Sequence, residues 1–181
     1  MRIGLDIDDT MTNSAETIRE YAAEYFKGED LDKVLDAPSI DGKLLEFLDK
    51  NLAEMSSKYT LKDNVKEVLD RLKEKGHEII IITARSYTPV QGNIIEVTLD
   101  HFKKNDIVVD DITFKALEKT KICIEKQIDI MIDDSIKVLE DLEKSGIDTL
   151  LFTTAKNKDK ETHLKRVKTW LEIEEYIDNR G

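Results

Sequence analysis

The residues best suited to chemistry lie near the start of the chain, in the run Ile3-Gly4-Leu5-Asp6-Ile7-Asp8-Asp9-Thr10. Carboxylates at the end of a buried strand are costly unless a cation or hydrogen bonds compensate them. Side chains alternate along a strand, so Asp6 and Asp8 leave the same face, about 7 Å apart. At that spacing one carboxylate can attack a phosphorus atom while the other reaches the leaving oxygen. The pattern predicts phosphoryl-transfer chemistry.

Four motifs occur in an order that is typical of a known family. Asp6-Ile7-Asp8-Asp9-Thr10 resembles the first motif (DxDxT) of the haloacid dehalogenase superfamily, in its phosphatase branch. The strand-like run Glu78–Thr83 resembles the second motif, Lys119 the third, and Ile130–Ser135, with its acidic pair, the fourth. Four motifs in order are far more specific than any one of them. The resemblance covers the chain except roughly residues 15–60.

The resemblance implies distinct roles for the first two acids. Asp6 is the expected nucleophile, which forms an aspartyl-phosphate. Asp8 is the expected general acid and base, which protonates the leaving alkoxide and then activates the hydrolytic water. Its backbone carbonyl is also an expected metal ligand. Asp9 points the other way and is interpreted as a turn or solvent residue, whereas Thr10 is expected to fix the loop.

A second pair of acids predicts a magnesium site. Asp133 and Asp134 follow an apolar strand, where two adjacent carboxylates would repel each other. Mg²⁺ takes hard oxygen ligands of this kind. The resemblance implies that Asp134 and Asp6 bind the ion directly and that Asp133 lies in its outer shell. A helix N-cap would explain one of the acids but not both.

The end of the second strand predicts a phosphate site. Thr83, with the backbone amides of Ala84 and Arg85, can donate hydrogen bonds to phosphoryl oxygens. The Arg85 side chain, like Ser86, has two interpretations: it contacts the substrate, or it is a solvated residue at a helix entry.

A lysine must offset the repulsion among these acids and a phosphate. Lys119 is the candidate because of its spacing to Cys123 and to the acidic pair. Lys115 and Lys121 are near neighbours in the same charged segment, so the sequence leaves them as alternatives.

Composition limits the classes of partner. The net charge is −11 and 37% of residues are charged, against about 25% in typical soluble domains. A strongly acidic chain is poorly suited to bind duplex nucleic acid or an anionic membrane. There is no apolar stretch long enough to span a bilayer, no room for a signal peptide before Ile3, and a single cysteine. We expect a cytoplasmic protein that acts on a small phosphorylated metabolite.

The spacing of apolar residues predicts an α/β fold, a Rossmann-like parallel sheet with helices on both faces. Expected strands are 2–7, 78–83, about 107–109, 128–132 and 148–152. Expected helices in this part of the chain are 65–72, about 89–102, 116–127, 136–145 and 161–176.

The segment 15–60 has no strand pattern and predicts two amphipathic helices joined by a turn around Pro38–Gly42. The resemblance implies a small helical cap inserted after the first strand, above a catalytic core formed by residues 1–14 and 61–181. Ligands of parallel sheets bind at the carboxyl ends of the strands, where such an insertion must lie. Its aromatic side chains either stack a nucleobase or only pack the cap: Tyr21, Tyr25, Phe26 and Phe47.

These observations favour a Mg²⁺-dependent phosphomonoester hydrolase. Ile82–Arg85, Leu151–Asn157 and Trp170–Ile173 further resemble the 5′(3′)-deoxyribonucleotidase-like group, which implies a nucleoside monophosphate as substrate. A sugar-phosphate phosphatase or phosphomutase would carry the same four motifs. A phosphate-sensing regulator such as a receiver domain is disfavoured, because it places its acceptor Asp on the third strand and its Lys after the fifth.

Overall fold

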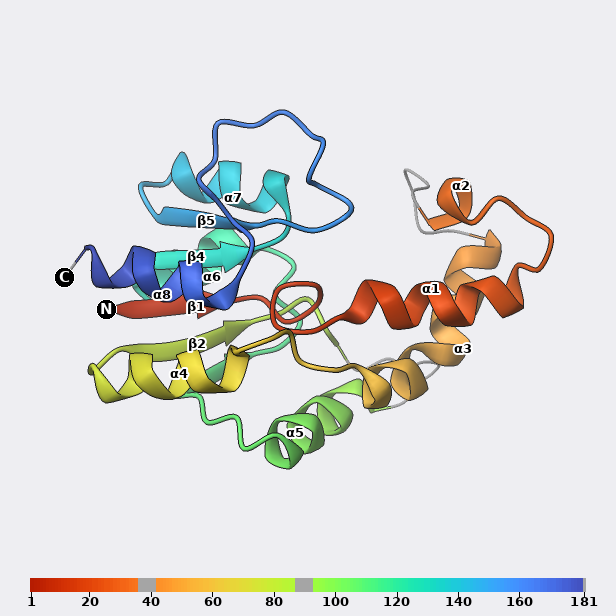
Figure 1. Cartoon of the computed structure of the whole chain (residues 1–181), viewed down its shortest axis with the longest axis horizontal. Coiled ribbons are helices and arrows are strands. Elements are labelled where there is room, and N and C mark those ends of the chain that lie inside the picture. The colour runs from red at the N-terminus through yellow and green to blue at the C-terminus, as the bar shows by residue number, and fades with distance from the viewer. Residues whose placement is uncertain (36–41, 87–92, 181) are drawn as a thin grey trace.

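Six strands form one parallel sheet in the computed structural model, which describes residues 1–35, 42–86 and 93–180. The strand order is β3-β2-β1-β4-β5-β6 (Figure 1). The strands are β1 (Arg2–Leu5), β2 (Glu78–Ile82), β3 (Asp111–Thr113), β4 (Ile130–Asp133), β5 (Asp148–Phe152) and β6 (Arg166–Val167). The helices are α1 (Ser14–Tyr25), α2 (Leu31–Leu35), α3 (Gly42–Lys58), α4 (Val65–Glu74), α5 (Ile94–Lys104), α6 (Lys119–Glu125), α7 (Ile136–Glu143) and α8 (Trp170–Asp178).

The predicted α/β fold with helices on both faces is confirmed. Residues of α4, α5 and α8 share one hydrophobic cluster with the sheet, and residues of α6 and α7 share a second cluster with the opposite face. In α4 the buried side chains recur at helical spacing, at Val65, Val68, Leu69 and Leu72, which is why this segment packs as a helix. The apolar stripes of the helices and the nearly continuous apolar strands together form the core.

The centre of the sheet determines where the acids meet. Leu5 of β1 pairs with Ile132 of β4, and the Asp6 amide donates a hydrogen bond to the Ile132 carbonyl at 3.0 Å. The Met131 side chain packs closely over Gly4, because a Cβ there would lie 2.7 Å from Met131 Sδ and that side chain would have to move. The strand order reverses between β1 and β4, and ligands bind at such a switch point.

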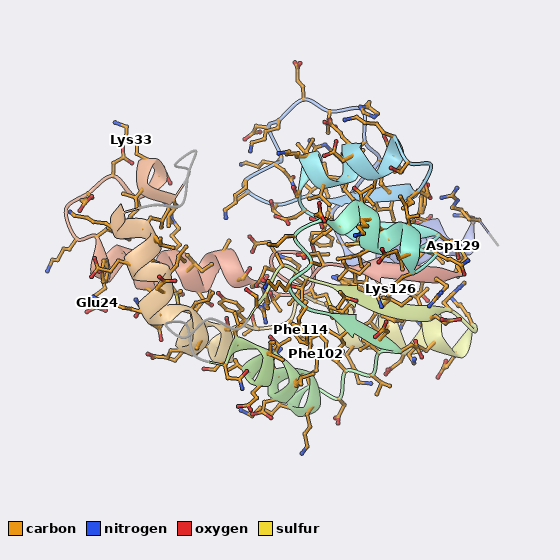
Figure 2. The ribbon with its side chains drawn as sticks, turned by 180° about the vertical axis from the view of Figure 1, so that it is seen from behind. Glu24, Lys33, Phe102, Phe114, Lys126 and Asp129 are labelled. Carbon is orange, nitrogen blue, oxygen red and sulfur yellow. The ribbon has the colours of Figure 1, made fainter. Side chains whose placement is uncertain are left out.

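Helices α1, α2 and α3 project to one side of the sheet and have a hydrophobic cluster of their own (Figure 1). The chain leaves and re-enters the sheet region side by side, because Thr12 and Leu61 form an antiparallel bridge. The Asn13 amide also donates to the Thr60 carbonyl at 2.9 Å. Figure 2 shows Glu24 and Lys33 on this helical part, far from Lys126 and Asp129 at the other end of the molecule.

The third strand lies later than expected. The predicted strand at 107–109 is wrong: β3 is Asp111–Thr113, with Ile80 paired to Asp111. The Ile107 amide instead donates to the Phe102 carbonyl at 2.9 Å and closes the end of α5. Ile107 and Val109 still pack on the core, which explains why their apolar pattern resembles a strand.

The C-terminal helix is shorter than the expected 161–176. Arg166–Val167 form β6, because the Thr153 amide donates to the Val167 carbonyl at 2.8 Å. Helix α8 begins only after Thr169, whose side chain caps it by accepting a hydrogen bond from the Glu172 amide at 3.2 Å. Leu164 and Val167 are buried, but as loop and strand residues.

Other boundaries differ less. Helix α6 begins at Lys119 rather than at residue 116, since the Ala116 amide bonds the Thr83 carbonyl at 2.9 Å. Residues 38–41 of the predicted turn and 89–92 of the predicted helix 89–102 lie outside the described residues, and Gly42 begins α3. The short helix α2 was not predicted. In the described part of the chain, every helix is too short or too polar to cross a membrane.

Candidate active site

The candidate catalytic residues lie at the carboxyl ends of the three central strands. Asp6 follows β1, Thr83 follows β2, and Asp133 ends β4. Parallel strands place these ends at one edge of the sheet, so residues far apart in the sequence meet there. Asp6, Asp133 and Thr83 are all nearly inaccessible to solvent.

Lys119 is the lysine that contacts these acids. Its Nζ donates to Asp6 Oδ1 at 2.6 Å and to Asp133 Oδ2 at 2.7 Å. Lys115 and Lys121 are both exposed. Although burial alone would lower it, the charges of Asp6 and Asp133 raise the pKa of Lys119. One buried ammonium therefore bridges the ends of β1 and β4.

Three carboxylates gather around this ammonium. Oxygen atoms of Asp6, Asp133 and Asp134 lie within 4.8 Å of one another. Burial first, and then repulsion from Asp133 and Asp8, raises the pKa of Asp6 to about 8 despite Lys119. Burial, Asp133 and Asp9 raise the pKa of Asp134 to about 7. The cluster carries more negative charge than Lys119 compensates.

The donor set fits a Mg²⁺ ion, which prefers hard oxygen ligands. Both Asp133 oxygens are already engaged, Oδ2 by Lys119 and Oδ1 by the Ser135 amide at 2.8 Å. Asp6 Oδ2 and the Asp134 carboxylate accept no hydrogen bond from the described residues. These two groups are therefore free to face a cation, as the sequence resemblance implies.

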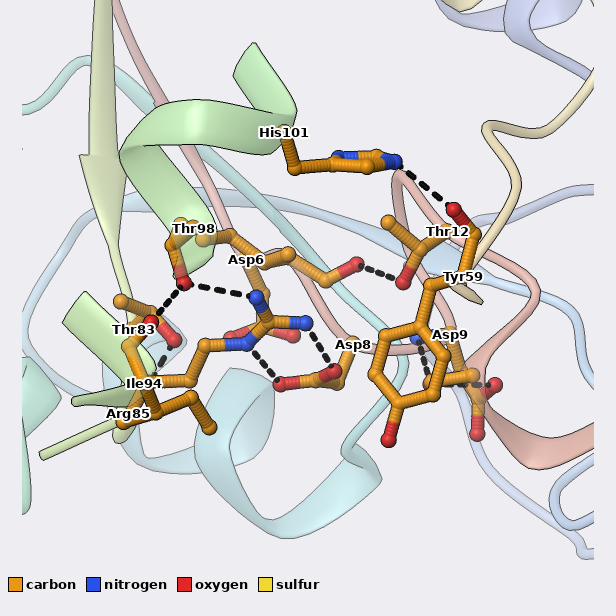
Figure 3. Close-up of polar contacts among 12 residues, drawn as sticks. Asp6, Asp8, Asp9, Thr12, Tyr59, Thr83, Arg85, Ile94, Thr98 and His101 are labelled. Atoms are coloured by element: carbon orange, nitrogen blue, oxygen red, sulfur yellow. Dashed lines mark hydrogen bonds and ion pairs between the residues drawn. The ribbon is translucent and has the colours of Figure 1, made fainter. Parts of the chain in front are cut away.

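Asp8 has a different partner. Arg85 Nη2 and Nε donate to its two carboxylate oxygens, at 2.6 and 2.9 Å (Figure 3). The Asp8 side chain is 43% exposed, whereas that of Arg85 is only 5% exposed. The interpretation of Arg85 as a solvated helix-entry residue is wrong, because a half-exposed acid and a buried guanidinium form a two-pronged ion pair.

The Arg85 guanidinium also contacts residues that sequence reasoning missed. Its Nη1 donates to Thr98 Oγ1 on α5 at 2.8 Å, and its guanidinium carbon lies 5.5 Å from the centre of the Tyr59 ring. The Tyr59 carbonyl contacts His101 Nε2, also on α5, at 2.7 Å (Figure 3). No spacing rule links these positions, so the sequence carries no signal for them.

The end of β2 is shaped by Thr83 and Ala84. Thr83 Oγ1 accepts a hydrogen bond from the Arg85 amide at 3.2 Å. Ala84 between them is exposed. The phosphate-binding roles of Thr83, Ala84 and Arg85 stay predictions.

Asp9 occupies a turn, as predicted, but it is buried rather than solvated, with 7% exposure. Its φ is 59°, a conformation that Asp tolerates better than most residues. Its Oδ1 accepts hydrogen bonds from Ser14 Oγ at 2.9 Å and from the Ala15 amide at 2.7 Å. A carboxylate at a helix start is a known capping signal, and here it anchors α1 to the site.

Asn157 supports the other side of the cluster. Its Nδ2 donates to the Asp134 carbonyl at 2.9 Å and to the Phe152 carbonyl at 2.8 Å. This residue belongs to the stretch Leu151–Asn157 that carried the nucleotidase resemblance, so a signal for it existed. Asn157 ties the loop after β5 to the residue expected to bind metal.

Comparisons with solved structures show the fold of haloacid dehalogenase-like hydrolases. A predicted phosphatase from Clostridium acetobutylicum aligns with a TM-score of 0.71 at 18% identity, over 98% of each chain. The haloacid dehalogenase-like hydrolase SP0104 from Streptococcus pneumoniae aligns at 0.66 and 16%, over 97% of each chain. CbbY from Rhodobacter sphaeroides, in complex with phosphate, aligns at 0.65 and 13%, over 95% of each. Curated protein sequences give no match.

The family model "5′ nucleotidase, deoxy (pyrimidine), cytosolic type C protein" matches residues 1–180. The chain belongs to this 5′-nucleotidase family. It is therefore a phosphatase, as its motifs predicted, and the match includes the segment 15–60 that the superfamily motifs alone do not cover.

Proposed function

We propose that this family member hydrolyses (deoxy)nucleoside monophosphates, with Mg²⁺, through an aspartyl-phosphate on Asp6. The observation that carries the proposal is the convergence of Asp6, Lys119 and the Asp133–Asp134 pair at one edge of the sheet. A nucleophilic carboxylate, a buried cation and a set of hard oxygen donors are what in-line attack on a phosphate monoester requires.

In the first half of the reaction, Asp6 attacks the phosphorus atom and the bond from phosphorus to the ester oxygen breaks. Asp8 gives its proton to the leaving alkoxide, which departs as the alcohol. Lys119 keeps the Asp6 carboxylate oriented through its 2.6 Å hydrogen bond.

In the second half, Asp8 takes a proton from water as the water oxygen attacks the phosphorus atom. The bond from phosphorus to Asp6 breaks, which restores the carboxylate and releases inorganic phosphate. Asp6, Asp134 and the Asp8 backbone carbonyl would hold a Mg²⁺ ion, which would supply positive charge between the anionic nucleophile and the anionic substrate. Thr83 and the Ala84 amide donate hydrogen bonds to the phosphoryl oxygens.

We further propose that residues 15–60 act as a cap that selects the leaving group, on a core formed by 1–14 and 61–181. The separate hydrophobic cluster of α1–α3 and the pairing of the two connecting segments at Thr12 and Leu61 support this division.

The family description, cytosolic type, supports a cytoplasmic location.

The aromatic side chains of this segment favour packing over base stacking. Phe26 and Phe47 are 2% and 0% exposed, and their ring centres lie 5.3 Å apart. Tyr21 Oη donates to Glu54 Oε1 at 2.8 Å. Of the four, only Tyr25 is exposed, at 41%. The nucleotide assignment therefore depends on the family match and not on these rings.

The test is a hydrolysis panel with the purified protein. Wild-type protein and Asp6→Asn are compared on deoxy- and ribonucleoside monophosphates and on sugar phosphates, with Mg²⁺ and with EDTA, against a protein-free blank. We expect Mg²⁺-dependent release of phosphate, fastest on nucleotides, and acid-stable label on wild-type protein from ³²P-labelled substrate. Preference for sugar phosphates would favour the alternative substrate class, and turnover by Asp6→Asn would refute the mechanism.

A further inference from the structure

We propose that Arg85 is a positioning residue that acts through Asp8: it fixes the orientation of the general acid and does not bind the phosphate. This inference rests on the proposed function, because it assigns Arg85 a part in the alkoxide-protonation step. An arginine at the end of β2 can either bind the phosphate or orient the general acid, and we assign Arg85 the second role.

The ion pair has the geometry that orients a carboxylate. Two N–H···O bonds from the Arg85 guanidinium, at 2.6 and 2.9 Å, hold one Asp8 oxygen each. Such a fork restricts rotation of the carboxylate, which a single lysine contact does not. Asp8 requires such restraint, because a side chain that is 43% exposed would otherwise sample several rotamers in water.

The remainder of the guanidinium is enclosed. Thr98 Oγ1 uses its proton on the Ile94 carbonyl at 2.7 Å, so it presents a lone pair to Arg85 Nη1 at 2.8 Å. The Tyr59 ring lies beside the guanidinium (Figure 3). With a side chain 5% exposed, Arg85 has little surface left for a substrate oxygen. Arg85 therefore acts on the reaction by holding the Asp8 carboxylate.

General acid catalysis explains why this orientation matters. Proton transfer requires the acid to lie within hydrogen-bond reach of the leaving oxygen. An alkoxide leaving group needs that proton, whereas an activated phenolate leaves readily without it. Loss of the Asp8 orientation must therefore slow alkyl phosphates much more than activated aryl phosphates. A residue that binds the phosphate itself would affect both substrates alike.

The chain contains a matched control. Arg71 on α4 makes the same kind of fork with Glu174 on α8, with Nη2 2.6 Å from Oε2 and Nε 2.9 Å from Oε1. This pair joins two helices on one face of the sheet and includes none of the proposed site residues. Arg71 is more exposed than Arg85, so replacing it tests whether the loss of a fork outside the site affects the rates.

The experiment compares Arg85→Met and Arg85→Lys with Arg71→Met and Arg71→Lys. For each variant, first-turnover rates are measured on a nucleoside monophosphate and on 2,4-dinitrophenyl phosphate, with KM and inhibition by inorganic phosphate. We expect Arg85→Met to lose on the order of 100-fold on the nucleotide and less than about tenfold on the aryl phosphate. KM and phosphate inhibition should stay unchanged, and the Arg71 variants should keep wild-type rates.

Arg85→Lys keeps the charge but not the fork, so it should show the same selective loss. Thr98→Val removes only the hydrogen bond from Arg85 Nη1 to Thr98 Oγ1, and it should show a smaller selective loss on the nucleotide. This variant serves as the test if Arg85→Met does not fold. Equal losses on both substrates, or weaker inhibition by phosphate, would overturn the proposal in favour of direct phosphate binding. Wild-type rates in Arg85→Lys would also overturn it. Failure of the proposed function is distinct, since wild-type protein would then release no phosphate from the nucleotide, whatever its rate on the aryl phosphate.

Discussion

Two carboxylates separated by one residue lie in contrasting surroundings in this phosphatase. Asp6 is buried in a cluster with Lys119, Asp133 and Asp134, all of them at strand or helix ends that the sheet brings together. Asp8 is half exposed and is held by Arg85, which depends on Thr98 and Tyr59 from outside the motifs. The acidic cluster is suited to nucleophilic attack and cation binding, and the Asp8–Arg85 pair to proton transfer.

The largest expected effect distinguishes the two carboxylates directly. Asp6→Asn should lower turnover by at least about 10³-fold on every substrate, because an amide is a poor nucleophile. Its stability without metal should equal or exceed that of wild type, since burial and the neighbouring carboxylates already disfavour a charge on Asp6. Steady-state assays and urea unfolding measure both, with Asp63→Asn, at an exposed position, as control. Substantial residual turnover in Asp6→Asn would contradict the role of Asp6 as the nucleophile.

Lys119→Met should cost both activity and stability. It removes the ammonium that bonds Asp6 and Asp133, and breaking a buried ion pair in this way costs about 3–5 kcal/mol of unfolding free energy. Added Mg²⁺ should recover part of that loss, because a cation then replaces the missing charge. Urea unfolding with and without Mg²⁺ tests this against Lys121→Met, an exposed lysine of the same helix. Equal behaviour of the two variants would contradict the bridging role.

The acidic pair after β4 should respond unequally to metal. Mg²⁺ should raise the thermal stability of the wild type, and Asp134→Asn should weaken that response more than Asp133→Asn. The physical reason is that both Asp133 oxygens are engaged by Lys119 and the Ser135 amide. Thermal shift titrations with Mg²⁺ on the two variants measure the order. Indistinguishable titrations would leave the assignment of inner and outer ligands without support.

The raised pKa of Asp134, about 7, predicts a pH dependence of stability in metal-free protein. The folded state holds a proton that the unfolded chain releases near its ordinary pKa of 3.8. This contribution is fully present below that value and is lost as the pH rises toward 7. Asp134→Asn should therefore lose less stability than wild type between pH 5 and 8, by up to about 1 kcal/mol per pH unit. Urea unfolding of both proteins across this pH range, with EDTA, measures the difference. Parallel plots of unfolding free energy against pH would contradict the raised pKa of Asp134.

The smallest effects are expected in the helical segment. Phe47→Leu should cost about 1 kcal/mol of stability, because its ring packs against those of Tyr25 and Phe26. Tyr25→Leu should cost less, since this residue is partly exposed. The ratio of nucleotide to aryl phosphate rates should stay constant in both. A selective loss on nucleotides would instead reveal a contact with the base, worth about 1–3 kcal/mol by analogy with single-strand stacking.

The acidic cluster was predictable because its residues follow strands. Apolar runs identify β1, β2 and β4 in the sequence, and parallel strands share a carboxyl edge, so Asp6, Thr83 and Asp133 had to meet. The predicted strand 107–109 and the predicted helix 161–176 were wrong because their apolar residues belong to other elements. Ile107 and Val109 pack on the core from the segment after α5, and Val167 lies in an edge strand that pairs only with β5.

The sequence pattern alone was enough for the α/β class, the strand-end acids and the family. The partner of Asp8 was decided only by tertiary structure. Arg85 was visible, but whether its guanidinium faces solvent, phosphate or Asp8 depends on α5 and Tyr59, which close over it from different parts of the chain. Periodicity records which face of an element is apolar, and it does not record which polar side chains two packed elements bring together.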